Sequence, residues 1–168
     1  MNRIGMIIPT LGTRPRWLSQ CLKSLEMQSY RPLDVLIVGP DLQLLRKLAD
    51  RHQVGFLPSV PNGLSCAINQ GWDALAPECE YLAWLGDDDL LAPGSLSMSV
   101  TALNGHPRAA FTFGRTRFID ESSASIYVST PTSFAPRYMR IGQDYLPQPG
   151  SLIRRSAVSW SPVLRTRE

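Results

Sequence analysis

Short apolar segments alternate with amphipathic ones over the first 107 residues. Four segments are apolar for most of their length and end at a proline, a glycine or a polar turn, as buried strands do: residues 3–8, 34–38, 54–57 and 81–85. Between them lie three segments whose apolar residues recur at helical spacing: 18–25, 42–49 and 64–75. Thr13 is the predicted cap of the first helix, and a fourth helix is predicted to begin near Pro93. This alternation predicts an α/β fold whose mostly parallel sheet has flanking helices and right-handed crossovers.

Polar turns follow three of these predicted strands. They are residues 9–10, residues 39–41 and the acidic run 86–89. Ligands of parallel sheets bind at the carboxyl ends of the strands, which meet at one edge of the sheet. We therefore expect the three turns to converge on one crevice.

The pattern changes after residue 108. Residues 109–119 are predicted to form one long strand and residues 126–129 a shorter one, joined by a hairpin turn at residues 120–123. Residues 131–149 are rich in proline and arginine without a clear period, which predicts a long loop. Order is expected to resume at residues 151–155.

Composition indicates a folded protein with a single core. The chain has 168 residues, of which 43% are hydrophobic and 18% charged, and this excludes a disordered chain. No stretch approaches the roughly 18 apolar residues of a membrane span, and the N-terminus lacks an extended apolar signal region. Three cysteines without a C-x-x-C pair indicate neither a disulfide framework nor a zinc knuckle. We expect no transmembrane segment and a cytoplasmic location, at most peripheral to the inner face of the membrane.

Charge is distributed unevenly along the chain. Residues 1–107 hold 8 Lys and Arg against 10 Asp and Glu, whereas residues 108–168 hold 9 against 4, and 15 of the 17 cationic residues are arginine. Arginine suits bidentate contacts with phosphate, although a GC-rich coding sequence also explains its excess. The arginines are scattered and no aromatic-basic motif accompanies them, so no nucleic-acid partner is expected.

The acidic run Asp87, Asp88 and Asp89 is the main candidate for chemistry. Adjacent carboxylates repel one another and favour a bound cation. Mg²⁺ or Mn²⁺ would take one or two of them and complete its shell with water and phosphate oxygens, which implies a phosphorylated ligand. The alternative is a solvated turn that caps the helix near Pro93.

Other acidic or phosphate-binding motifs do not fit. A calcium hand starting at Asp87 would need glycine and glutamate where Ala92 and Met98 stand. A receiver or a phosphatase would need aspartates after the first strand, where Pro9 and Thr10 stand. The G-x-G-x-x-G fingerprint and the P-loop are both absent.

An ordered series of short motifs gives a family resemblance. The series comprises Ile7-Ile8-Pro9-Thr10, Leu22-x-x-Leu25-x-x-Gln28, Val35-Leu36-Ile37-Val38, Asn62-Gly63-Leu64 with Ala67-x-Asn69-x-Gly71, and Tyr81-Leu82-Ala83-Trp84-Leu85-Gly86-Asp87-Asp88-Asp89. Together with Pro147-Gln148-Pro149-Gly150-Ser151 and Ile153-Arg154-Arg155, it resembles the family 2 glycosyltransferases of the Rossmann-like GT-A fold. The resemblance implies a metal-dependent, inverting transfer of a sugar from a UDP- or dTDP-sugar to a glycan, lipid-linked or cell-envelope acceptor.

The resemblance also implies roles for particular residues of the donor site. It places Pro9, Thr10 and Leu11 against the base, and Arg14 near the base or the phosphates. Gly63 and Asn69 would shape the donor pocket. The alternative for these two is a helix start capped by Asn62 and an interior amide.

The acidic run corresponds to the D-x-D motif of the family. Asp88 stands at the position of the metal-binding aspartate, and Asp87 and Asp89 flank it as further predicted ligands of Mn²⁺ or Mg²⁺. Gly86 occupies the position whose aspartate often contacts the ribose, so Asp87 is expected to take that contact. The metal and a nearby arginine would neutralise the departing nucleoside diphosphate.

The chain departs from the family pattern at two further positions. Where the family usually has an aspartate that holds the base, this chain has Gly39, with Asp41 two positions later as the candidate. Ile68 stands where an arginine often precedes the asparagine of the third motif.

The expected general base is the largest departure. The family's acidic residue beyond the Arg-Arg segment does not appear before Glu168, and Asp120, Glu121 and Asp144 are the remaining downstream carboxylates. Asp144 is the candidate catalytic residue. We therefore expect a donor-binding half in residues 1–107 and an incomplete acceptor-side half in residues 108–168 of a single domain, in a chain that is truncated or naturally short.

Two other functions stay open. A non-catalytic nucleotide-binding or interaction module of the same fold would explain the missing base. A nucleotidyltransferase would ordinarily have a glycine-rich basic loop after the first strand, where residues 11–16 have one glycine and two arginines. Self-association through an exposed apolar sheet face is a further expectation.

Overall fold

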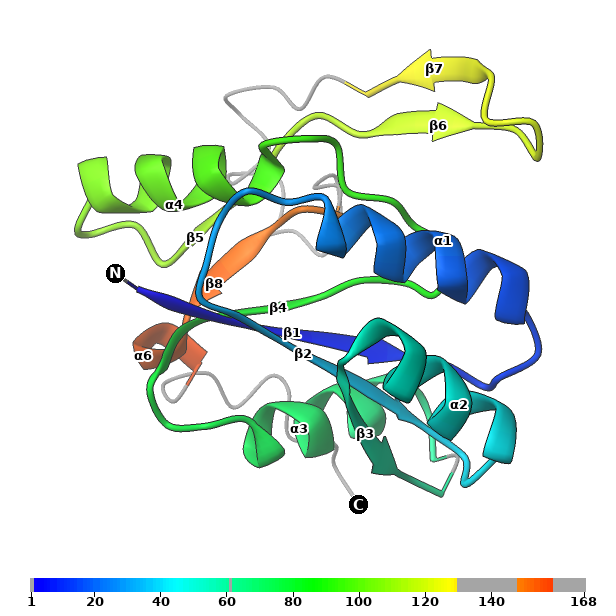
Figure 1. Ribbon diagram of the computed structural model, residues 1–168. Coiled ribbons are helices and arrows are strands. Elements are labelled where there is room, and N and C mark those ends of the chain that lie inside the picture. The colour runs from blue at the N-terminus through cyan, green and yellow to red at the C-terminus, as the bar shows by residue number, and fades with distance from the viewer. Residues whose placement is uncertain (1, 61, 130–147, 159–168) are drawn as a thin grey trace.

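The protein is an α/β structure built around a six-stranded sheet (Figure 1). The computed structural model describes residues 2–60, 62–129 and 148–158. The sheet has the order β3-β2-β1-β4-β8-β5, and the strands β6 and β7 form a separate two-stranded sheet. The strand bounds are β1 Arg3–Pro9, β2 Leu33–Gly39, β3 Gly55–Pro58, β4 Cys79–Trp84, β5 Phe111–Thr112, β6 Arg117–Ile119, β7 Ser125–Val128 and β8 Leu152–Arg154.

The first four strands are parallel, as the alternating pattern predicts. The helices that connect and flank the strands are α1 Pro15–Glu26, α2 Gln43–His52, α3 Leu64–Ala74, α4 Ser95–Gly105 and α6 Arg155–Val158. The carboxyl ends of β1, β2 and β4 therefore lie at one edge of the sheet. This edge positions the site described below.

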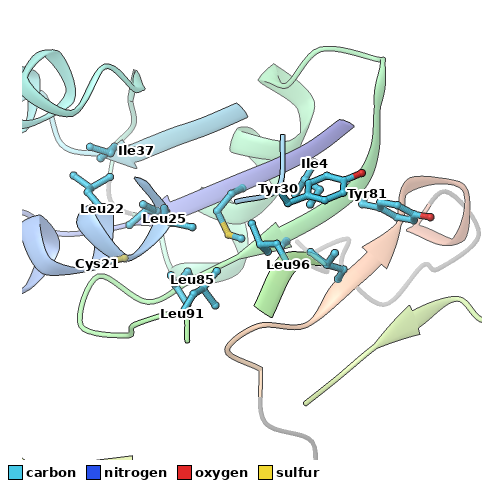
Figure 2. Packing of buried hydrophobic residues seen from close by; sticks show 14 of the residues in the cluster. Ile4, Cys21, Leu22, Leu25, Tyr30, Ile37, Tyr81, Leu85, Leu91 and Leu96 are labelled. Carbon is cyan, nitrogen blue, oxygen red and sulfur yellow. The ribbon is translucent and has the colours of Figure 1, made fainter. Parts of the chain in front are cut away.

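Each face of the sheet buries its own apolar cluster. On β1, Ile4, Met6 and Ile8 belong to the cluster that α1, α2 and α4 cover, whereas Ile7 belongs to the cluster under α3. Figure 2 shows the first cluster, in which Leu22 of α1 lies among buried side chains from the strands. Successive residues of a strand point to opposite faces, so a strand buried on both faces is apolar throughout. This explains the continuous apolar segments of the sequence.

Helix α1 also holds the segment that follows β4. Gln28, just beyond the helix, is buried, and its amide donates to the Ala92 carbonyl at 3.0 Å and accepts from the Leu96 amide at 3.3 Å. The Ser24 hydroxyl accepts a hydrogen bond from the Leu91 amide at 3.0 Å. These bonds satisfy buried polar groups that would otherwise be costly. They fix the chain directly after the acidic run.

Two local predictions are wrong. Thr13 does not cap α1, because Pro15 supplies the first helical residue, and the cap residue Arg14 makes no side-chain capping bond. Residues 109–119 do not form one strand. Only Phe111 and Thr112 pair with β8, which is itself three residues long, and the chain then leaves the main sheet so that Arg117–Ile119 pairs with β7.

Strand β8 joins the main sheet in the antiparallel sense, between β4 and β5. Arg154 at its end and Arg155 at the start of α6 lie near the amino end of β4, away from the edge where the polar turns meet. Arg154 donates to the carbonyls of Ala109 and Leu103 at 2.7 and 2.6 Å, and Arg155 donates to the Cys79 carbonyl at 2.8 Å. These arginines therefore bind the backbone of the fold. In the part of the chain that the structure describes, no helix has the length and apolar character needed to cross a membrane.

Candidate functional site

A cleft of about 460 Å³ opens at the carboxyl edge of the sheet. We call it the main cleft. The end of β1, the end of β2, the start of α3 and the acidic run all contribute to it, so the predicted convergence of the three turns is observed. Its lining residues are Pro9, Thr10, Leu11, Thr13, Arg14, Val38, Gly39, Pro40, Ser59, Val60, Asn62, Gly63, Leu64, Ala67 and Asp87.

Asp87 is the buried member of the acidic run. The Thr10 hydroxyl donates to its Oδ2 at 2.5 Å, and Nη2 of Arg14 donates to its Oδ1 at 2.8 Å. The Thr10 hydroxyl in turn accepts from the Gly12 amide at 3.0 Å. Both oxygens of Asp87 are therefore held by the loop that follows β1, and Asp87 fixes that loop against the end of β4.

Asp88 is the exposed member. Its side chain is 41% exposed, against 5% for Asp87, and its Oδ2 accepts a hydrogen bond from Nη1 of Arg14. One guanidinium thus bridges two neighbouring carboxylates, which suits its forked geometry. Of the three aspartates, Asp88 presents the carboxylate that a ligand in solvent reaches most easily.

Asp89 is the half-buried member of the run. Burial raises the pKa of its carboxyl, and the charge of Asp88 raises it further, while a hydrogen bond from the Gly86 amide acts in the opposite direction. The Cys21 thiol lies close by and donates to the Gly86 carbonyl at 3.5 Å. Burial, and then the charges of the acidic run, raise the pKa of this thiol, so it stays neutral. Over residues 2–60, 62–129 and 148–158, no three acidic, histidine or cysteine side chains are arranged as a ready metal cluster.

Apolar side chains make up much of the lining of the main cleft. Leu11 and Leu64 are 62% and 53% exposed although their side chains are aliphatic, and Val60 is also exposed. The cap residue of α3 is Gly63, with a positive φ of 83° and no side-chain capping bond, so Asn62 does not cap this helix. The start of α3 lies at the cleft, where Gly63 and Leu64 line it, and a helix N-terminus favours an anion.

Some predicted site residues lie elsewhere. Asp41 is outside the lining of the main cleft, and Nε of Arg46 donates to its Oδ1 at 2.7 Å; this hydrogen bond holds the pKa of the Asp41 carboxyl below its usual range. Asn69 is half-buried one turn into α3 and is not a lining residue. Asp144 lies outside the described residues. Gly86 directly precedes the aspartates in the sequence, and a Cβ added to it would be 2.7 Å from Oδ2 of Asp89.

Gly39 has a steric explanation that the sequence alone does not reveal. A Cβ built on Gly39 would lie 2.4 Å from the backbone oxygen of Thr10. The usual family aspartate therefore cannot occupy this position unless the loop after β1 moves. Sequence reasoning also missed Ser59, Val60 and Leu64 as lining residues. Their position after β3, at the same sheet edge, was the available signal.

The comparisons with known proteins now identify the family. The chain matches the model of glycosyl transferase family 2 over residues 6–159, and it belongs to that family. The resemblance drawn from the sequence motifs is therefore confirmed. None of the curated proteins compared with the chain matches it.

Two solved structures share the fold. The structure of S. aureus TarS 1–349 is 17% identical, with a TM-score of 0.56 over 66% of this chain and 34% of TarS. The mannosyltransferase PcManGT from Pyrobaculum calidifontis, solved in complex with GDP-Man and Mn²⁺, is 20% identical, with a TM-score of 0.55 over 65% of this chain and 34% of PcManGT. The chain thus spans about a third of the length of each.

A further structure shows how widely the fold is used. The 4-diphosphocytidyl-2C-methyl-D-erythritolsynthase from Anaerococcus prevotii is 13% identical, with a TM-score of 0.59 over 94% of this chain and 73% of that protein. At such identities, structural likeness establishes the fold alone, here an α/β fold of the GT-A type. The family match, and not the fold, distinguishes this chain from that protein.

Proposed function

We propose that this chain binds a nucleotide-sugar donor, a UDP- or dTDP-sugar, in the main cleft and serves metal-dependent, inverting sugar transfer. The acceptor would be a glycan or a lipid-linked or cell-envelope molecule. The observation that carries the proposal is the exposed carboxylate of Asp88, which lies outside the lining of the main cleft but pairs with Arg14, one of its lining residues. Apolar lining residues next to a charged group suit a ligand made of a flat base and a diphosphate.

The lining residues divide naturally between the two parts of such a donor. Leu11, Val60 and Leu64 would pack against the base, together with Pro9 and Pro40 at the strand ends. In this assignment Thr10 holds Asp87 rather than the base. The amides at the start of α3 and the guanidinium of Arg14 would face the diphosphate. Asp41 and Asn69 would act only indirectly.

The donor set of the acidic run fits a divalent cation at Asp88. Mn²⁺ and Mg²⁺ take one or two protein carboxylates and complete their shell with water and phosphate oxygens. Asp87 has both oxygens engaged by Thr10 and Arg14, so its role would be to hold the loop, and Asp89 would support the turn from below. The bound cation would supply Lewis-acid stabilisation to the departing nucleoside diphosphate. The Mn²⁺ in PcManGT supports this assignment by analogy.

Arg14 has two competing roles in this proposal. It bridges Asp87 and Asp88, which reduces the repulsion between the two carboxylates. A cation at Asp88 would displace one arm of the guanidinium, and the freed arm would then face the phosphates. Arg14 would thus contact the donor phosphates only when a cation is bound at Asp88.

A non-catalytic nucleotide-binding module is the second candidate. The observation that favours it is the loss of two family residues: Gly39 stands where the family usually has an aspartate, and Ile68 where it often has an arginine. Donor hydrolysis separates the two functions. Slow hydrolysis that depends on Mn²⁺ would support the enzyme, whereas tight donor binding without any turnover would support the module.

A thermal-shift screen tests the proposal most broadly. The full chain would be heated with each of a panel of nucleotide sugars, in the presence of Mn²⁺, of Mg²⁺ or of a chelator. We expect at least one UDP- or dTDP-sugar to raise the melting temperature with metal and to lose most of that effect with the chelator. No shift with any donor, in either metal, would defeat the proposal.

We also propose that the β6–β7 hairpin supports self-association. Phe118, Ile126 and Tyr127 are 52%, 70% and 59% exposed, and the rings of Phe118 and Tyr127 stack with their centroids 5.8 Å apart. Exposed apolar patches of this kind commonly mark contact surfaces. Multi-angle light scattering should show a mass that grows with protein concentration. A constant monomer mass at high concentration would count against it.

A further inference from the structure

A second cleft, of about 250 Å³, lies on the other side of the acidic run. Its walls come from three parts of the chain that are far apart in sequence. Trp17 and Gln20 belong to the first turns of α1, Asp88 and Leu90 to the segment after β4, and Glu121 to the tip of the β6–β7 hairpin. The hairpin lies on the same side of the main sheet as α1 (Figure 1).

The second cleft meets the main cleft at one ion pair. Asp88 lines the second cleft, Arg14 lines the main cleft, and the two side chains are joined by a hydrogen bond. A group bound in the second cleft would therefore lie next to the charged end of the main cleft. This is the relation that a transferase needs between its two substrates.

The lining of the second cleft suits a carbohydrate. Its volume is below the roughly 300–1,000 Å³ of sites for drug-sized ligands, so it matches a small group such as one sugar ring rather than a nucleotide. The half-buried indole of Trp17 offers a flat apolar surface and a polar N–H. Gln20 and Glu121 add an amide and a carboxylate, which bind hydroxyl groups.

The hairpin turn leaves one of its two carboxylates available. Asp120 accepts hydrogen bonds from the Ser122 amide at 2.8 Å, the Ser122 hydroxyl at 2.6 Å and the Ala124 amide at 2.9 Å, and these bonds lower the pKa of its carboxyl. Asp120 therefore shapes the turn. Glu121 is exposed and forms no hydrogen bond or ion pair with any residue in the described ranges. Its carboxylate is therefore available to accept a hydrogen bond from a hydroxyl group.

We propose that the second cleft is the subsite for the sugar ring of the acceptor, with Trp17 against the ring and Glu121 and Gln20 on its hydroxyls. The inference rests on the proposed function, because it takes the main cleft as the donor site. Trp17 and Glu121 are assigned to binding and positioning of the acceptor.

The test uses the full chain, ¹⁵N-labelled and saturated with UDP and the diamagnetic Mg²⁺, and methyl glycosides of glucose, galactose, mannose and N-acetylglucosamine as probes. We expect at least one glycoside to shift the Trp17 indole resonance. The Trp72 indole, which donates to the Ala83 carbonyl at 3.2 Å inside the fold, should not move. Trp17→Ala and Glu121→Gln should weaken binding of that glycoside at least about tenfold, which corresponds to about 1.4 kcal/mol.

Two controls separate this inference from the proposed function. Met98→Ala removes an exposed side chain of α4 outside the second cleft, so it should leave glycoside binding unchanged. Trp17→Ala and Glu121→Gln should also retain the thermal shift that donor and metal produce. If that shift is intact and no glycoside perturbs Trp17, or if both variants bind glycoside normally, the second cleft is not the subsite although the donor site stands. If donor and metal give no shift in the unchanged protein, the proposed function itself fails.

Discussion

Asp88→Asn is expected to abolish the rise in melting temperature that a nucleotide sugar and Mn²⁺ produce together. Asparagine keeps the size of the side chain but removes the charge that a hard cation requires. The unliganded protein should lose little stability, because the pair between Arg14 and Asp88 is exposed and such pairs contribute about 0–1 kcal/mol. Differential scanning fluorimetry of both proteins, with and without ligand, measures the two effects.

Two companion variants make this result specific. Asp41→Asn removes an exposed carboxylate that lies outside the main cleft, so its ligand-induced shift should equal that of the unchanged protein. Arg14→Gln leaves Asp88 without its guanidinium partner, so calorimetry should show tighter binding of Mn²⁺ alone and weaker binding of the donor. A full donor shift in Asp88→Asn would remove Asp88 from the metal site.

Gly39→Ala is expected to destabilise the protein by about 1–3 kcal/mol and to eliminate donor binding. The added methyl group would lie 2.4 Å from the backbone oxygen of Thr10, and a backbone atom cannot move aside as the end of a flexible side chain can. The displaced loop would carry the Thr10 hydroxyl away from Asp87 and distort the main cleft. Urea denaturation and the donor thermal shift are the measurements.

Gly105→Ala is the matched control for this prediction. A Cβ at Gly105 has no neighbour within 4 Å, and this glycine lies at the end of α4, far along the chain from the cleft residues. This variant should keep normal stability and donor binding. If Gly39→Ala behaves like Gly105→Ala, the close approach of β2 and the loop after β1 does not constrain the site.

Much of the fold was predictable because local sequence patterns indicate each strand and helix of the parallel core. Each of β1 to β4 is a short apolar segment bounded by a turn residue, and each helix between them has apolar residues at helical spacing. The prediction that polar turns meet at one edge needed only the rule that parallel strands share a direction. The family resemblance depended on the order of the same segments.

The remaining features depend on contacts between distant residues. The position of β8 between β4 and β5 is set by pairing across about 70 residues, as in Tyr81 with Arg154, and no local pattern shows such a partner. The different roles of the three aspartates also escape sequence reasoning. Burial and partners, not residue type, distinguish Asp87, which Thr10 and Arg14 hold, from the exposed Asp88.

The position of the hairpin is a further example. The spacing of residues 120–123 predicts a turn, and the structure has one, but nothing in the spacing places Glu121 beside Trp17 of α1. That proximity comes from the position of the second sheet on the α1 side of the main sheet (Figure 1). The candidate for an acceptor subsite therefore becomes visible only in the three-dimensional structure.

The assignment of Asp88 can be checked by anomalous diffraction from a crystal soaked with Mn²⁺ and a UDP-sugar. We expect a manganese peak within coordination distance of the Asp88 carboxylate, bridging to the diphosphate, with the base against Leu11 and Leu64. An acidic run without manganese, or a nucleotide bound away from the main cleft, would contradict it.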